Sequence, residues 1–329
     1  MRFRFVAILT FLGAGATDAH AQATLHLEVE AKIPLGDVRG RIDHLALDID
    51  GQRLFVAELG NNTVGVIDLK QRKVAQRLEG LDEPQGTAWS PQRSMLYVAS
   101  GGDGTLRSFT GRGLAKGLVV KLGDDADNVR VDAAGQRVYV GFGNGAIAVV
   151  DSATLKRQAD LRLTGHPESF QLEQNGTRIF VNVPDRPEIT ALDRSGAAPV
   201  QHWAAREARA NFPLALDEAA GRVYSVFRSP AALEVLSTKD GTSLVRVPVC
   251  ADADDLFLDD ARHLAYIVCG EGRVDVIETQ SGSYRKISSV STVSGARTGL
   301  YSKDLDRLFV AVRASAREPA AIWVLKPAE

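Results

Sequence analysis

The chain has 329 residues, 45% of them hydrophobic, which is enough to bury a large core in one to three domains. Its 39 Lys and Arg residues are nearly balanced by 41 Asp and Glu residues, giving a formal charge of −2. Binding to nucleic acid normally requires a basic excess or a basic stripe, so this balance disfavours nucleic acid as a partner.

The first 21 residues match a secretory signal peptide. Two arginines precede an apolar run, Phe5–Leu12, and Ala19-His20-Ala21 fits the small-x-small rule for cleavage before Gln22. The run is shorter than the ~20 residues that span a bilayer, and no other stretch approaches that length. We therefore expect a soluble periplasmic or secreted protein, with one domain covering residues 22–329 and no membrane span.

An apolar triplet with a central aromatic residue recurs along the rest of the chain. The first copy is Leu54-Phe55-Val56 and the last is Leu308-Phe309-Val310. The seven aromatic residues, spaced 42, 42, 41, 44, 42 and 43 positions apart, are Phe55, Tyr97, Tyr139, Phe180, Tyr224, Tyr266 and Phe309. A period of this length indicates a repeat fold. We expect the aromatic side chains to pack as core between neighbouring repeats.

Each repeat contains the same order of strands. In the first repeat, His44–Asp48 leads through a polar turn to the aromatic strand, and Val64–Asp68 and Lys73–Leu78 supply two more. These alternating or short apolar runs, bounded by turn-forming residues, are typical of strands. Four strands in roughly 40 to 45 residues form a propeller blade. The predicted fold is therefore all-β, a seven-bladed β-propeller with four-stranded antiparallel blades.

The residue that ends each first strand is a hydrogen-bond acceptor. These residues are Asp48, Ser90, Asp132, Glu173, Asp217, Asp259 and Ser302. Such side chains accept hydrogen bonds from the backbone N–H groups of a following turn, so we expect a structural role for them.

The two ends of the chain predict how the ring closes. The last repeat stops at its third strand, Ala321–Lys326, while an unassigned strand, Leu25–Ile33, precedes the first repeat. If the N-terminal strand completes the last blade, no free sheet edge remains at the seam. We expect the closed ring to be a monomer.

Function is expected on one face of this ring. The turns between first and second strands are monotonous, whereas the loops into first strands and out of second strands differ in every blade. Variable loops on a regular scaffold are where function concentrates. The loops into first strands place around the channel mouth Arg41, Asp43, His44, Glu83, Gln85, Gly86, Asp125, Asp127, Asn128, His166, Glu168, Ser169, Asn211, Phe212, Pro213, Asp252, Asp254, Asp255, Arg297 and Thr298. The loops after second strands add Glu58, Arg228, Glu271 and Arg313.

Part of this polar ring has the chemistry of a ligand site. The predicted ligand-binding residues are Asp43, His44, Asp127, Asn128, Arg130, His166, Glu168, Asn211, Asp254, Asp255 and Arg297. Carboxylates that converge with histidines hold divalent cations, so a divalent cation is one candidate cofactor. The alternatives are that these side chains cap loops, form ion pairs or are solvated, or that they bind a polar organic ligand without metal. The pattern assigns no catalytic residue and no specific set of metal ligands.

Arg130 is the most unusual member of the set. The residues at its position in the other blades are Ala46, Ala88, Gln171, Ala215, Phe257 and Leu300. A guanidinium inside the fold needs a carboxylate or an anionic ligand. A structural ion pair is the favoured reading, with an anionic ligand as the alternative.

The two cysteines, Cys250 and Cys269, fall in loops on the same face of the sixth repeat. Exported thiols rarely stay reduced, which favours a disulfide, and two small buried residues are the alternative. Their spacing matches no metal or redox motif.

The repeats are similar to those of the bacterial YVTN or YncE-like β-propeller family. Gln52–Asp68 carries the likeness best, and it extends over all seven repeats. Gly123–Arg130, Gly165–Phe170 and Gly295–Thr298 resemble segments of an exported subgroup. The resemblance implies the propeller fold and leaves activity open, because related propellers serve as binding modules, partners of redox enzymes, lyases and lactonases.

Two hypotheses for function follow. The first is an exported binding protein that presents the polar ring to a small polar ligand or to a partner protein. The second is a metal-assisted hydrolase or lyase of the lactonase-like kind, in which Asp127, Glu168, Asp255 and a histidine surround a cation and another side chain acts as general base.

Overall fold

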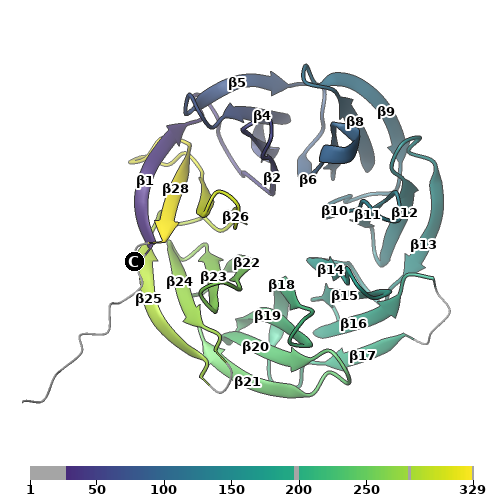
Figure 1. The fold of residues 1–329 in the computed structure, drawn as a ribbon, viewed down its shortest axis with the longest axis vertical. Coiled ribbons are helices and arrows are strands. Elements are labelled where there is room, and N and C mark those ends of the chain that lie inside the picture. The colour runs from purple at the N-terminus through teal and green to yellow at the C-terminus, as the bar shows by residue number, and fades with distance from the viewer. Residues whose placement is uncertain (1–26, 196–199, 281–282, 328–329) are drawn as a thin grey trace, which may run out of the picture.

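The computed structural model describes residues 27–195, 200–280 and 283–327; the predicted signal peptide lies outside this range. The described strands form seven four-stranded antiparallel sheets arranged in a ring, the seven-bladed β-propeller that the sequence predicts (Figure 1). Helical structure in this part of the chain is limited to two short 3-10 turns, η1 (Leu59–Asn61) and η2 (Pro91–Arg93). A search of the same residues finds no helix fit to span a bilayer.

Six blades are built from strands that follow one another in the chain, and each blade runs from the channel outward. Blades 1 and 2 are β2 (Leu45–Asp48), β3 (Arg53–Glu58), β4 (Thr63–Asp68), β5 (Lys73–Leu78) and β6 (Pro84–Ser90), β7 (Met95–Ser100), β8 (Thr105–Thr110), β9 (Ala115–Lys121). Blades 3 and 4 are β10 (Val129–Asp132), β11 (Arg137–Phe142), β12 (Ala146–Asp151), β13 (Arg157–Arg162) and β14 (Phe170–Leu172), β15 (Arg178–Val183), β16 (Glu188–Asp193), β17 (Gln201–Ala204). Blades 5 and 6 are β18 (Arg209–Asp217), β19 (Arg222–Ser229), β20 (Ala231–Ser237), β21 (Ser243–Pro248) and β22 (Ala253–Asp259), β23 (Leu264–Cys269), β24 (Arg273–Glu278), β25 (Arg285–Ser291).

The seventh blade joins the two ends of the chain. Its inner strands are β26 (Gly299–Ser302), β27 (Arg307–Val312) and β28 (Ala321–Pro327), and the outer strand is β1 (Leu27–Pro34). β1 pairs antiparallel with β28 along its whole length, with one bulge. The predicted closure by the N-terminal strand is therefore confirmed, and every strand of the seventh sheet has its partners.

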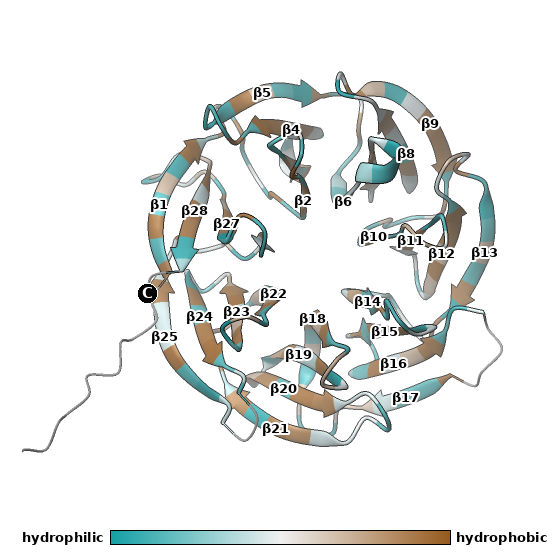
Figure 2. Cartoon of the chain, viewed as in Figure 1, coloured by the Kyte–Doolittle hydropathy of each residue, from teal (hydrophilic) through white to brown (hydrophobic). Residues whose placement is uncertain are grey.

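The core lies between adjacent blades. The two middle strands of each blade are the most hydrophobic, as Figure 2 shows, while the outer strands alternate between polar and apolar residues. All seven repeat aromatics are at most 2% exposed. Phe55 of β3, for example, packs in one cluster with Leu96 and Val98 of the next blade. The aromatic positions are core residues, as predicted, and they fix the angle between neighbouring sheets.

Acceptor side chains at the ends of the innermost strands close the hairpin turns on the face opposite the variable loops. In blade 1 the Oδ1 atom of Asp48 accepts a hydrogen bond from the backbone N–H of Gly51 at 3.0 Å. Equivalent bonds to the following turn are accepted by Asp132, Asp217, Asp259 and Ser302. Five of the seven predicted turn acceptors thus make the expected contact, while Glu173 accepts from the backbone N–H of Arg178 at the start of β15.

Candidate functional site

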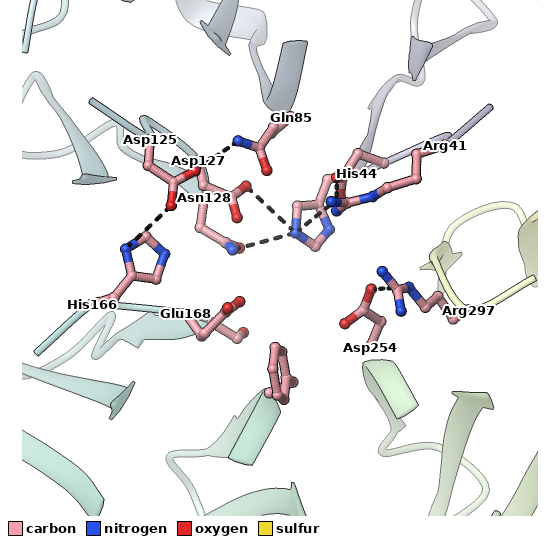
Figure 3. A pocket seen from close by; sticks show the side chains of 13 residues that line it. Arg41, His44, Gln85, Asp125, Asp127, Asn128, His166, Glu168, Asp254 and Arg297 are labelled. Carbon is pink, nitrogen blue, oxygen red and sulfur yellow. Dashed lines mark hydrogen bonds and ion pairs between the residues drawn. The ribbon is translucent and has the colours of Figure 1, made fainter. Parts of the chain in front are cut away.

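A cavity of about 200 Å³ opens at the mouth of the central channel. All seven blades contribute to it through residues that lead into, or begin, their innermost strands. Its walls consist of Arg41, Asp43, His44, Gln85, Asp125, Asp127, Asn128, His166, Glu168, Ser169, Phe212, Asp254 and Arg297. The variable loops that were aligned from the sequence therefore meet around one polar hollow (Figure 3).

A recurrent backbone conformation turns these loops toward the channel. Asp125 and Asp252 begin the two similar segments of blades 3 and 6, and both adopt a left-handed φ, of 53° and 57°. Aspartate tolerates this region better than most residues because its short side chain bonds locally. Glu83, Ala210 and Gly295 hold the same position in their blades and are also left-handed. The bend places the carboxylates two residues further on, Asp127 and Asp254, in the cavity wall.

His44 occupies the centre of a group of carboxylates. Its Nε2 atom lies 3.8 Å from Asp43 Oδ1 and 3.9 Å from Asp127 Oδ1, and its Nδ1 atom lies 3.7 Å from Asp255 Oδ1. Burial acts to lower the pKa of His44, but these carboxylates raise it well above the usual histidine value. The surrounding carboxylates therefore favour the charged form of the ring, which offsets part of their negative charge.

Asp127 is buried beside His44 and lacks a hydrogen-bond donor. The residue is 8% exposed, and its carboxylate accepts no hydrogen bond from the described residues; its Oδ1 atom is fully enclosed. Burial, together with the neighbouring Asp43 and Glu168, raises the pKa of Asp127 to about 8, against the lowering effect of His44 and His166. An enclosed carboxylate without a donor carries the full desolvation penalty of an unpaired polar group.

Glu168 is a second carboxylate without a partner. Its backbone N–H bonds to Asn182 O at 3.0 Å, but its side chain makes no ion pair or hydrogen bond with the described residues. Burial raises the pKa of Glu168 to about 7, with a further rise from Asp254. The carboxylate points into the cavity, on the side that Asp125 and Asp127 also line (Figure 3).

The remaining buried carboxylates are paired with arginines. Asp43 accepts a 2.7 Å hydrogen bond from Arg41 Nη2. Asp254 pairs with Arg297 Nε at 2.8 Å and also with Arg228. Burial nevertheless raises the pKa of Asp254 to about 6, against the lowering effect of the two guanidiniums. The arginines on the cavity wall therefore already have carboxylate partners.

His166 lies at the opposite edge of the hollow from Arg297. Its Nδ1 atom is 2.7 Å from the carbonyl oxygen of Gly143, to which it donates when protonated there, and 3.6 Å from Asp125 Oδ2. Asp125 in turn accepts a 3.0 Å hydrogen bond from Gln85 Nε2. This chain of contacts holds the loops of blades 2, 3 and 4 together at the rim.

Two of the predicted ligand residues lie deeper, beside the cavity wall. Asp255 contacts His44, as above, and accepts a 2.8 Å hydrogen bond from the backbone N–H of Gly299. Arg130 donates to the carbonyl oxygen of Val129 at 2.9 Å, and its guanidinium lies 5.4 Å from the Phe170 ring. It forms no ion pair with the described residues, in contrast to the structural pair that the sequence favoured. Burial lowers the pKa of Arg130, while Asp255 and Asp127 act to raise it.

Asn211, also predicted to bind ligand, does not line the cavity. It is fully buried, and its Nδ2 atom donates to Asn182 Oδ1 at 3.0 Å and to Glu188 O at 2.8 Å. These bonds join blades 4 and 5. The structure therefore gives Asn211 a packing role between two blades.

Five lining residues belonged to the predicted ring but not to the selected ligand set. They are Arg41, Gln85, Asp125, Ser169 and Phe212. Their position in the aligned loops was a sufficient signal: four of the five lie within two residues of a selected one, and Gln85 holds in its blade the position that Asp127 holds in blade 3. Phe212 packs under the guanidinium of Arg228, whose Cζ atom lies 3.6 Å from the ring centroid. It is the one aromatic wall of an otherwise polar hollow.

Cys250 and Cys269 are joined by a disulfide, with their Cα atoms 5.9 Å apart. The bridge connects the loop before β22 to the end of β23. The backbone N–H of Cys250 also donates to the buried carboxylate of Asp275 at 2.8 Å. The disulfide thereby anchors the segment that carries Asp252, Asp254 and Asp255.

Metal-binding side chains do not converge in the described part of the chain. No group of three or more His, Cys, Asp or Glu residues there is arranged to hold a metal ion. At the channel mouth the imidazole of His44 lies between Asp43, Asp127 and Asp255, 3.7 to 3.9 Å from an oxygen of each.

Comparisons with known proteins support the fold and do not extend to a function. No protein-family model matches the sequence, and no curated protein matches it. Among solved structures, a chain of the hydrazine synthase from Kuenenia stuttgartiensis is similar, with a TM-score of 0.75 and 15% sequence identity. The match covers 88% of this chain and 96% of that chain. At this identity the likeness establishes the propeller fold alone.

Proposed function

We propose that the protein binds a small polar molecule carrying a protonated amine in the cavity at the channel mouth. The observation that carries the proposal is the pair of carboxylates at Asp127 and Glu168, which line the cavity and accept no hydrogen bond from the described residues; the one ionic contact between them and those residues is the 3.9 Å approach of His44 Nε2 to Asp127. An ammonium group supplies both the positive charge and the N–H donors that these carboxylates lack.

The charges along the wall favour a cation over an anion. Above the pKa values of Asp127 and Glu168, about 8 and about 7, five carboxylates line the hollow against two guanidiniums and the ring of His44. Both guanidiniums are bound to carboxylates, so the groups left to recognise a ligand are acceptors. A cavity of about 200 Å³ is small beside the ~300–1,000 Å³ that typically holds a drug-sized molecule. Recessed groups in so small a hollow suit a small ligand better than a partner protein.

The metal-assisted hydrolase or lyase is less well supported. It requires Asp127, Glu168, Asp255 and a histidine around one ion, and the described residues contain no such arrangement. The recessed, high-pKa carboxylates are compatible with general acid or base chemistry, but the hydroxyl in the cavity wall, that of Ser169, donates to the carbonyl oxygen of Leu214 at 3.4 Å and not to a histidine. We therefore give binding precedence over catalysis.

We also make two proposals from the sequence, one on where the protein is located and one on its family. We propose that the protein is exported, because residues 1–21 have the pattern of a signal peptide and because disulfides persist in oxidising compartments. We also propose a relationship to the YVTN or YncE-like propellers, on the strength of the repeated Arg-apolar-aromatic segments.

The proposal is tested with ethanolamine and ethylene glycol, two probes of similar size of which only ethanolamine is charged. Calorimetric titration at pH 8 is expected to give binding of ethanolamine and none of ethylene glycol. Asp127→Asn or Glu168→Gln should weaken ethanolamine binding by about tenfold or more, as for loss of a charge-assisted hydrogen bond. Asp124→Asn, an exposed position in the same loop, is the matched control and should bind as the wild type does. Equal binding of both probes would refute the proposal.

A further inference from the structure

A second, smaller hollow adjoins the first at the channel mouth. Its volume is about 80 Å³, and its lining is Arg41, Ile42, Asp252, Gly295, Arg297, Ala311 and Arg313. Arg41 and Arg297 line both hollows, so the two share a wall.

The charge of the second hollow is opposite to that of the first. Three guanidiniums face a single carboxylate there, that of Asp252. Asp252 is already engaged, because its Oδ1 atom lies 3.2 Å from Arg297 Nη1 and 3.3 Å from Arg228 Nη1. Converging guanidiniums in excess over carboxylates are the usual recognition device for a planar anion.

Arg313 is the arginine of the second hollow that has no carboxylate partner among the described residues. It is exposed at the end of β27 and makes no ion pair or side-chain hydrogen bond with the residues that the structure describes. The other two arginines of the hollow are held by Asp43, Asp252 and Asp254. The forked donors of Arg313 are therefore available to a ligand.

The side chain of Arg313 packs against Gly295. The φ of Gly295 is +83°, and a Cβ atom added there would overlap the Arg313 guanidinium. The backbone N–H of Gly295 bonds to the carbonyl oxygen of Gly270 at 2.7 Å, which fixes the loop. The guanidinium thus lies directly against a glycine backbone, at the edge of the hollow.

We propose that the second hollow binds a carboxylate and that the natural ligand is a small zwitterion, with its amine toward Asp127 and Glu168 and its carboxylate toward Arg313. In Figure 3 the guanidiniums of Arg41 and Arg297 lie on one side of the cavity, and the unpaired carboxylates lie across it. A ligand with charges at both ends complements this division. The proposal that the ligand is a zwitterion depends on the amine site proposed above. The proposal of a carboxylate subsite depends only on the second hollow.

The test uses four probes at pH 8: ethanolamine, propionate and the amino acids β-alanine and 4-aminobutyrate. At least one amino acid is expected to bind about tenfold or more tightly than ethanolamine. Arg313→Ala should remove that advantage and abolish propionate binding while leaving ethanolamine binding unchanged. Arg317→Ala, an exposed arginine in the same loop that lines neither hollow, is the control. Melting temperatures of both variants should match the wild type, because each position is exposed.

The outcomes separate the two proposals. If propionate binds and depends on Arg313 while ethanolamine fails to bind, the carboxylate subsite stands and the amine site fails. If Arg313→Ala changes neither propionate binding nor the ratio between amino acid and ethanolamine affinities, the carboxylate subsite is overturned. The subsite is equally overturned if Arg317→Ala has the same effect as Arg313→Ala, since the effect is then one of net charge.

Discussion

Asp127 Oδ1 lies 3.9 Å from His44 Nε2, close enough for strong electrostatic attraction and too far for a hydrogen bond. The imidazolium is shared with Asp43 and Asp255, so the carboxylate of Asp127 remains without a donor. Such an arrangement lowers the stability of the empty protein and raises its affinity for a cationic ligand. Groups held in this way are commoner at functional sites than elsewhere.

The stability of the protein should fall as pH rises between about 5 and 8. Burial raises the pKa of Asp127 from its ordinary 3.8 to about 8, so between these values the unfolded chain binds fewer protons than the folded one. The free energy of unfolding therefore decreases with pH over this interval. Asp127→Asn should flatten the profile by on the order of 2 kcal/mol, as measured by urea unfolding at pH 5 and pH 8. Parallel profiles for the variant and the wild type would show that Asp127 does not titrate in this range.

Binding of an amine should change with pH in the opposite direction. The carboxyls of Asp127 and Glu168, with pKa values of about 8 and about 7, must lose their protons before they can pair with an ammonium group. Ethanolamine affinity is expected to rise from pH 6 to pH 8, with net release of protons on binding. Calorimetry in two buffers of different ionisation enthalpy measures that release. Proton uptake, or an affinity that falls over the same interval, contradicts the assignment.

The disulfide should support both stability and the site. It closes a loop with a sequence separation of 19 residues, for which about 3 kcal/mol of stabilisation is typical. Replacing Cys250 and Cys269 together by Ala should lower stability by roughly this amount and weaken amine binding, because the anchored loop carries Asp254. Dithiothreitol should destabilise the wild type and have no effect on the double variant. An unchanged affinity in the double variant would limit the bridge to a stabilising role.

Ring closure should depend on β1. Deleting residues 27–34 exposes the edge of β28 and removes Leu27 and Ile33 from the core, where they are 4% and 1% exposed. The melting temperature is expected to fall by roughly 10 °C or more. Val29→Ala, at a position 41% exposed on the same strand, is the control and should change it little. A deletion variant as stable as the wild type would contradict closure through this strand.

The sequence predicted the fold better than it predicted the partners within the site. Aromatic spacing was sufficient to count the blades, because each aromatic side chain is core at an equivalent position. Aligning the loops of the seven repeats correctly predicted which segments lie at the channel mouth. It also treated Asn211 as a loop residue. In the structure β18 begins at Arg209 and bulges between Asn211 and Leu214, so the asparagine side chain enters the interior. The innermost strands of blades 2 and 6 bulge at corresponding places, between Pro84 and Thr87 and between Ala253 and Asp255, and the repeat pattern marks none of the three.

The sequence also did not predict which side chains contact one another across the channel. The ion pair expected for Arg130 does not form among the described residues, and the guanidinium instead lies 5.4 Å from the ring of Phe170 in the next blade. Conversely, Asp43, Asp127 and Asp255 come from three blades and share His44, a contact that depends on the curvature of the ring. Such relationships are set by how far each side chain reaches across the channel, which the repeat pattern does not encode.

A crystal structure of the protein with ethanolamine at pH 8 would show whether Asp127 and Glu168 bind an amine at the channel mouth. The account predicts the ammonium nitrogen in the cavity, about 2.7–3.2 Å from a carboxylate oxygen of Asp127 or Glu168. Ethanolamine bound elsewhere on the molecule, or a metal ion coordinated by these carboxylates in its place, would contradict it.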